Sequence, residues 1–277
     1  MSVDAKAAFN QEVEQDDQAI DLFYAGLLIA QHVDQVSDLE PYILELRDLT
    51  AAIQPALVDV PTEMGRIEVL HQHLFEKFQF KGNSSDYYHP DNSFLNRVLT
   101  QRQGIPISLS VIYLTIGWRL DLPVYGIGIP NHFVVGYGYP DTVAYIDVFN
   151  QGKILDEIDL LDLAQLPESD LEPFRQEYLK PTPRKLILHR MLLNLKHIYV
   201  QQKNWENAYK VSDLTLLIHP NLPSEVRDRG LIAYRLNRLN DAIYDVRNYL
   251  LLAPKAKDAE WLTQHLQTME RKLASWN

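Results

Sequence analysis

A histidine and an aspartate lie on two neighbouring segments that have the composition of β-strands. If the turn between them is centred between residues 140 and 141, His132 pairs with Phe149 and Val134 pairs with Asp147. Side-chain alternation then places His132 and Asp147 on one face, as diagonal neighbours with Cβ atoms roughly 7 Å apart. A carboxylate there can hold an imidazole in one tautomer and support its charged form. The pair is therefore a candidate for acid–base chemistry.

The same two residues also have a purely structural interpretation. They can form a hydrogen bond beside the core that takes part in no reaction, and a one-residue slip of the register would separate them. The hairpin alone favours this structural role. The segment before the hairpin decides how much weight the catalytic role deserves.

Four segments resemble motifs of transglutaminase-like proteins, and more closely those of the SirB1 family. They are Asn92-Ser93-Phe94-Leu95-Asn96, Gly104-Ile105-Pro106-Ile107-Ser108-Leu109-Ser110, Asn131-His132-Phe133 and Asp147-Val148-Phe149-Asn150. That family joins a transglutaminase-like domain to tetratricopeptide repeats, and the resemblance covers the chain from about residue 93 onwards. Two departures are small: Asn131 stands where glycine is common, and Val148 stands where proline is common.

The resemblance implies a cysteine nucleophile at the start of a buried helix, but the chain contains no cysteine. In an active member, the helix dipole and the histidine lower the pKa of the thiol and give a thiolate. An ungapped alignment places Pro106 in that position. Proline supplies no nucleophile and no backbone N–H for an oxyanion. The resemblance therefore implies a degenerate site.

Ser108 is the alternative nucleophile for a site with His132 and Asp147. It follows Pro106 by two residues, about 200° around a helix, so it points away from His132 unless the helix begins later. A serine would also need strong activation by a base. The competing interpretation is that Ser108 bonds nearby backbone in the first turn of the helix. A water activated by His132 is the other hydrolytic alternative.

Other histidines are weaker candidates. His71 and His73 are two residues apart on a predicted helix, so they face different ways and make a poor metal pair. His89 lies in a polar loop near Asp86 and Asp91, where a solvated loop is favoured over a metal site. The sequence has no phosphate loop, dinucleotide fingerprint or zinc pattern. We expect neither a cofactor nor a metal.

The apolar pattern predicts an α+β core of the papain or transglutaminase kind, in which a buried helix precedes an antiparallel sheet. Residues 1–80 are expected to form helices that pack on this core, which spans 81–165. A proline-containing linker at 166–184 separates the core from an all-α segment at 185–277. The elements expected in the core are helices at 93–102 and 106–120 and strands at 124–129, 132–137 and 143–149.

The C-terminal segment repeats itself at an interval of 34 residues. Asn207-Ala208-Tyr209 recurs as Asp241-Ala242-Ile243, and Pro220 recurs as Pro254. Small alanines let two helices cross closely, and proline ends the second helix. The segment resembles two tetratricopeptide repeats followed by a capping helix at 258–273; an unrelated pair of helical hairpins is the alternative. By this resemblance the first helix of each repeat lines a partner groove, with Arg190, His197, Arg227 and Tyr234 as candidate contacts or as solvated helix faces.

Composition narrows the kinds of partner. The formal net charge is −11, from 26 basic and 37 acidic residues. This balance disfavours nucleic acid and anionic membranes as partners, because both require a basic surface. Residues 1–17 lack a secretory apolar core, and the apolar run at 23–30 is too short to span a bilayer. We expect a cytoplasmic protein.

Two functions are compatible with these features. The first is a non-catalytic interaction or regulatory protein, a pseudoenzyme that binds a protein or peptide through its repeats and its degenerate cleft. The second is a hydrolase of peptide or amide bonds, with His132 as base, Asp147 orienting it, and Ser108 or water as nucleophile. Pro106 favours the first function, while the retained His132 and Asp147 keep the second open.

Overall fold

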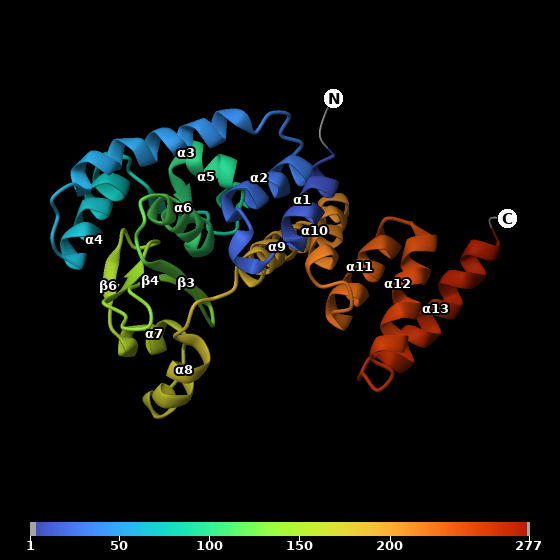
Figure 1. The fold of residues 1–277 in the computed structure, drawn as a ribbon. Helices are drawn as coiled ribbons and strands as arrows, with labels where there is room; N and C mark the ends of the chain where they lie inside the picture. Colours follow the sequence, from blue (N-terminus) through green and yellow to red (C-terminus); the bar gives the residue numbers. More distant parts are fainter. Residues whose placement is uncertain (1–3, 276–277) are drawn as a thin grey trace. The chain divides into compact units, whose positions relative to one another are not determined.

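The structure, a computed structural model, describes residues 4–275 and divides into two compact units (Figure 1). The first unit is Gln15–Met191, and the second comprises residues 4–14 and 192–275. The division falls inside helix α9 (Arg184–Gln201), beyond the segment 166–184 that was predicted as a linker. That segment belongs to the first unit, where it forms a 3-10 turn (Glu168–Asp170) and helix α8 (Leu171–Tyr178).

Helices of the first unit lie around one buried helix, α6 (Pro106–Arg119). Within the first unit they are α2 (Leu22–Val33), α3 (Glu40–Ile53), α4 (Glu63–His71), which continues as a π-helical turn (Gln72–Lys77), and α5 (Leu95–Gln101). Short 3-10 turns occupy Asp17–Ala19, Gln54–Leu57 and Pro90–Asn92. Helices α2, α3 and α5 pack against α6. Because α6 is buried from Pro106 to Gly117, it is apolar nearly all round.

A four-stranded antiparallel sheet covers another side of α6, which packs against β3 and β4. The strands lie in the order β3 (Val124–Ile129), β4 (His132–Tyr137), β5 (Ala144–Asp147) and β6 (Lys153–Leu155). Two further strands, β1 (Lys81–Gly82) and β2 (Gln103–Gly104), form a parallel pair. The predicted bounds of β3 and β4 are confirmed. The sequence pattern missed β1, β2 and β6 because strands of two or three residues show no periodicity.

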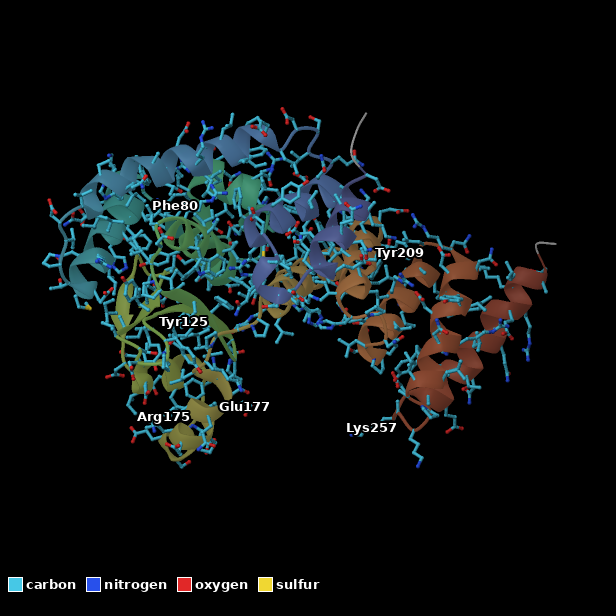
Figure 2. The ribbon with its side chains drawn as sticks, viewed as in Figure 1. Phe80, Tyr125, Arg175, Glu177, Tyr209 and Lys257 are labelled. Atoms are coloured by element: carbon cyan, nitrogen blue, oxygen red, sulfur yellow. The ribbon has the colours of Figure 1, made fainter. Side chains whose placement is uncertain are left out.

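The register of the central hairpin is the predicted one. Val135 pairs with Ile146 and Tyr137 with Ala144, which is the same alignment that opposes Val134 to Asp147. On β3, the ring of Tyr125, labelled in Figure 2, belongs to the sheet. It packs over Gly136, where an added Cβ would lie 2.2 Å from the ring. Gly136 is therefore needed for this close packing.

Helices α7 (Glu157–Leu163) and α8 pack on the sheet away from α6. Their apolar residues join those of β3 and β4 in one core cluster that includes Ile127, Val134, Leu160, Leu161 and Phe174. Arg175 of α8, seen at the lower edge of Figure 2, binds the carboxylate of Glu157 at 2.5 Å. This pair is exposed, so we expect it to contribute little beyond the apolar cluster.

The second unit is a row of antiparallel helices. After the C-terminal half of α9 come α10 (Trp205–Ile218), α11 (Pro223–Arg235), α12 (Leu239–Leu252) and α13 (Ala259–Ala274), and α11, α12 and α13 lie side by side (Figure 1). The two predicted repeat alanines, Ala208 and Ala242, are fully buried. Gly230 approaches α12 so closely that an added Cβ would lie 3.0 Å from the Cβ of Asp245. These small residues permit the close helix crossings expected of the repeats.

Helix α1 (Ala5–Glu14) belongs to the second unit, although residues 1–80 were predicted to pack on the core. It packs against α10 and buries Phe9 and Val13. Lys6 forms an ion pair with Asp213 of α10. Asp213 also forms an ion pair with Arg229. Arg229 in turn donates two hydrogen bonds of 2.8 Å to the buried Asp245. The apolar spacing of α1 predicted a packing helix but carried no information about which unit it joins.

Candidate functional site

The position predicted for the nucleophile lies at the start of α6, with Pro106 as the first helical residue. Proline suits this position because the N–H of a first helical residue has no partner inside the helix, so its absence costs no hydrogen bond. Gly104, two residues before Pro106, is closely packed, since an added Cβ would lie 2.7 Å from the Ser108 hydroxyl. The chain thus enters α6 tightly, with no nucleophilic atom on the first helical residue.

Ser108 is engaged with the backbone. Its hydroxyl is fully buried, donates to the carbonyl of Asn92 at 2.5 Å and accepts the N–H of Ile105 at 3.1 Å. Its single proton is therefore directed away from any imidazole. Within residues 4–275, no hydroxyl forms a hydrogen bond with the ring of His132. The geometry matches the competing interpretation of Ser108 as a first-turn helix residue.

His132 begins β4 directly after a two-residue turn. Ile129 pairs with His132 across that turn, and Asn131 adopts the left-handed conformation with φ of 61°. Asparagine tolerates this conformation better than other residues with a Cβ. Asn131, which stands where glycine is common in the family, therefore still permits the turn that positions His132.

His132 and Asp147 come together as the hairpin register predicts. Nε2 of His132 lies 3.1 Å from Oδ1 of Asp147, and both side chains are almost buried. The two atoms are within hydrogen-bond distance, but the direction of the ring nitrogen is not aligned with the carboxylate oxygen. Because Nε2 faces the aspartate, Nδ1 is left for any group on the other side of the ring.

Asp147 is held by the chain that follows it. Its Oδ1 accepts the N–H groups of Phe149 and Asn150 at 3.0 and 3.2 Å, and its Oδ2 accepts the side-chain amide of Asn150 at 2.7 Å. Burial alone would raise the pKa of Asp147. The contact with His132 and the bonds from Asn150 outweigh burial and hold this pKa below its ordinary value. The carboxylate is therefore charged and fixed in place.

The loop before α5 closes over this hairpin, and Asn92 organises it. The buried side chain of Asn92 donates to the carbonyls of Asp86 and Tyr87 at 2.6 and 3.2 Å. The ring of Tyr87 then meets the edge of Phe149 at 5.9 Å, and burial is the main reason that the pKa of Tyr87 is raised. Tyr87 and Phe149 therefore form an aromatic wall beside His132, which lies 6.3 Å from Phe149 between ring centres.

Arg190 lies at this hairpin and differs from its predicted place in a repeat groove. Its guanidinium donates to the carbonyls of Ile129 and His132 at 2.8 Å each. Burial lowers its pKa, and the nearby Tyr87 acts in the opposite direction. Arg190 thus clamps the turn that presents His132. The sequence pattern missed this because a helix position does not reveal which distant carbonyls it meets.

A groove on the second unit, which we call the α9–α11 groove, has a volume of about 560 Å³. Its lining residues are Leu193, Asn194, Lys196, His197, Val200, Trp205, Asp228, Leu231, Ile232 and Arg235. The lining residues come mainly from α9 and α11.

Of the predicted contacts on the second unit, only His197 lines this groove. Arg227 instead binds Asp228 and Asp258, at 3.0 and 3.1 Å. Tyr234 packs in the α11–α13 cluster, with Lys272 over its ring. Arg235 lines the groove and lies eight residues after Arg227 on the same helix. The helical repeat could have indicated it, but nothing in the sequence singled it out.

No group of three or more histidine, aspartate or glutamate side chains in residues 4–275 is arranged to hold a metal. Among the helices of the same residues, none has the length and apolar composition needed to cross a membrane.

Comparison with known proteins agrees with this architecture. A profile of the transglutaminase-like superfamily matches residues 40–193, and a tetratricopeptide-repeat profile matches residues 195–267. A UPF0162 protein of Xylella fastidiosa is 31% identical over 256 residues, which cover 91% of this chain and 90% of that protein. Protein SirB1 of Salmonella typhimurium is 25% identical over 249 residues, covering 89% of this chain and 92% of that protein. Mouse F-box only protein 21 is 33% identical over 107 residues, which are 36% of this chain and 17% of that protein.

Proposed function

Since this chain belongs to the transglutaminase-like superfamily, in the group of the UPF0162 and SirB1 proteins, we propose that it is a non-catalytic member that binds a protein or peptide partner. The proposal rests on two residues at the start of α6, neither of which offers a reactive group. Pro106 has no reactive atom, and the hydroxyl of Ser108 is committed to the carbonyl of Asn92.

The histidine and aspartate have a structural role in this proposal. Asp147 ties together the end of β5, the following turn and His132, while Arg190 ties the backbone of His132 to α9. Such a buried charged pair is costly to break, because removal of one partner leaves the other uncompensated. Retention of the pair therefore needs no reaction to explain it.

The α9–α11 groove supplies the binding surface. Its volume lies in the range of ligand pockets, and apolar side chains of two helices face it. Helical grooves of this kind accept peptides through a few apolar anchors. The partner is bound by the repeats, and the transglutaminase-like unit presents a second, unreactive surface.

Two measurements test the proposal together. Incubation of the full chain with a fluorophosphonate probe is expected to leave Ser108 unlabelled, because its proton is bonded to a carbonyl. Val200→Asp in the groove is expected to abolish recovery of cellular partners, while Leu251→Asp on exposed α12 keeps it. Labelling that disappears in both Ser108→Ala and His132→Ala, or partner recovery indifferent to Val200→Asp, would contradict the proposal.

A hydrolase that uses an activated water is the second candidate function. The observation that favours it is the 3.1 Å contact of His132 with a charged Asp147, which would support a general base. A screen of amide and ester substrates with the wild type, His132→Ala and Asp147→Asn would decide between the two functions. Turnover lost in both variants favours hydrolysis.

A further inference from the structure

The charged residues at one end of the α9–α11 groove neutralise one another. Lys196 is buried and binds Glu225 and Asp228 at 2.7 and 2.8 Å. The other oxygen of Asp228 accepts Arg227. These charges are fully used inside the second unit, so this end of the groove offers no free charge to a ligand.

The other end of the groove presents a cation. Arg235, at the last residue of α11, is exposed, and its guanidinium carbon lies 5.8 Å from the ring centre of Trp205. In the described part of the chain, no carboxylate lies within ion-pair distance of Arg235. A positive group without a counter-charge is notable in a chain of net charge −11.

Apolar side chains lie between the two ends. Val200 follows Lys196 on α9 by one helical turn, and Leu231 lies between Asp228 and Arg235 on α11. Val200 is 37% exposed although it is large and apolar. A ligand that covers it would gain the free energy of apolar burial.

We propose that the α9–α11 groove binds a peptide segment in which an apolar side chain sits on Val200 and Leu231 and a carboxylate pairs with Arg235. This inference rests on the proposed binding function and specifies its ligand chemistry. Arginine suits this task because its fork bonds both carboxylate oxygens, and the face of Trp205 holds the guanidinium in place. We assign the carboxylate to an acidic side chain of the peptide, and a response only to a free peptide C-terminus would overturn that assignment.

Synthetic peptides test this chemistry without knowledge of the natural partner. The probes are fluorescent eight-residue peptides of glycine and serine with one leucine and one aspartate, placed at every spacing from one to five residues, with both ends blocked. Each has a partner with asparagine in place of aspartate. A second set carries leucine near a free C-terminal carboxylate, with amidated partners. Anisotropy with the full chain measures affinity.

At one spacing, the peptide with aspartate is expected to bind about tenfold more tightly than its asparagine partner, which corresponds to about 1.4 kcal/mol. Arg235→Glu removes that preference, Arg235→Lys keeps part of it, and Arg271→Glu on exposed α13 leaves it intact. Thermal unfolding of each variant reports on folding. The set that responds identifies the source of the carboxylate.

The inference is overturned if charged and neutral peptides bind with equal affinity in both sets, or if none binds. It is also overturned if Arg271→Glu removes the preference for the carboxylate as fully as Arg235→Glu does. The proposed function is judged separately. If Val200→Asp abolishes recovery of cellular partners but Arg235→Glu does not, the binding function stands and the carboxylate pairing fails. If Val200→Asp has no effect on partners, the binding function itself fails.

Discussion

At the residue scale, the proposed loss of catalysis depends on one side chain at the first position of a helix. Pro106 and Pro223 each begin a helix, but only Pro106 stands at the position predicted for the nucleophile. Because the chain has no cysteine, a thiol introduced at either position can be observed alone. The matched pair separates the effect of the helix dipole from the effect of His132.

A cysteine introduced as Pro106→Cys is expected to have a pKa well below the ordinary value of about 8.5, since a helix start and an imidazolium both stabilise a thiolate. Pro223→Cys should show only the smaller effect of the helix start. The ultraviolet absorbance of the thiolate, followed against pH, gives both values. If His132→Ala leaves the pKa of the introduced thiol unchanged, Pro106 does not occupy the nucleophile position.

Asn131 gives a second residue-scale test, because its φ of 61° carries a conformational cost for most residues. Asn131→Gly is expected to leave the free energy of unfolding almost unchanged. Asn131→Val should lower it by roughly 1–2 kcal/mol, because a β-branched side chain is disfavoured in the left-handed region. Urea unfolding measures both variants, and a tolerated valine would show that the turn has another conformation.

At the element scale, the sequence predicted most of the core and part of the site. The bounds of β3 and β4 and the hairpin register followed from alternation and from the turn at residues 140–141. The place of Arg190 could not be predicted, because its bonds to Ile129 and His132 join positions about 60 residues apart. The place of α1 depended on a similarly distant contact. Periodicity describes a helix face but not its neighbour.

The loop before α5 depends on one buried amide, which makes Asn92 a test at this scale. Asn92→Ala leaves the carbonyls of Asp86 and Tyr87 without their donor and is expected to lower the free energy of unfolding by about 1–3 kcal/mol. It should also expose residues 83–91 to limited proteolysis. Asn240→Ala on exposed α12 is the control. Unchanged proteolysis would mean that the loop is held by other contacts.

At the scale of the whole molecule, stability should depend on pH through buried groups that favour one protonation state. Burial lowers the pKa of His71 to about 4, and its Nε2 lies 3.3 Å from the hydroxyl of Tyr113, which can donate to it. Between its ordinary value of 6.5 and about 4, the unfolded chain binds a proton that the folded protein does not. Stability is therefore lost as pH falls through this range. Asp147, whose pKa is lowered, adds a loss in the same direction at more acidic pH.

The expected loss from His71 is about 3 kcal/mol between neutral pH and pH of about 4, from roughly 1.4 kcal/mol for each pKa unit. His71→Gln keeps a hydrogen-bond acceptor for Tyr113 but removes the titration. Its free energy of unfolding should therefore change less over the same range. Chemical denaturation at several pH values measures the slope, and identical slopes in both proteins would exclude His71 as the cause.

The docking of α1 on α10 also bears on how the chain is made. During synthesis, Phe9 and Val13 emerge from the ribosome long before their partner surface, since 191 positions separate Glu14 from Trp205. Through most of translation this amphipathic segment remains without its native neighbour. The second unit must therefore complete its folding after translation or very late in elongation. An N-terminal fusion that obstructs residues 5–14 would impair this unit, although almost all of its residues lie near the C-terminus.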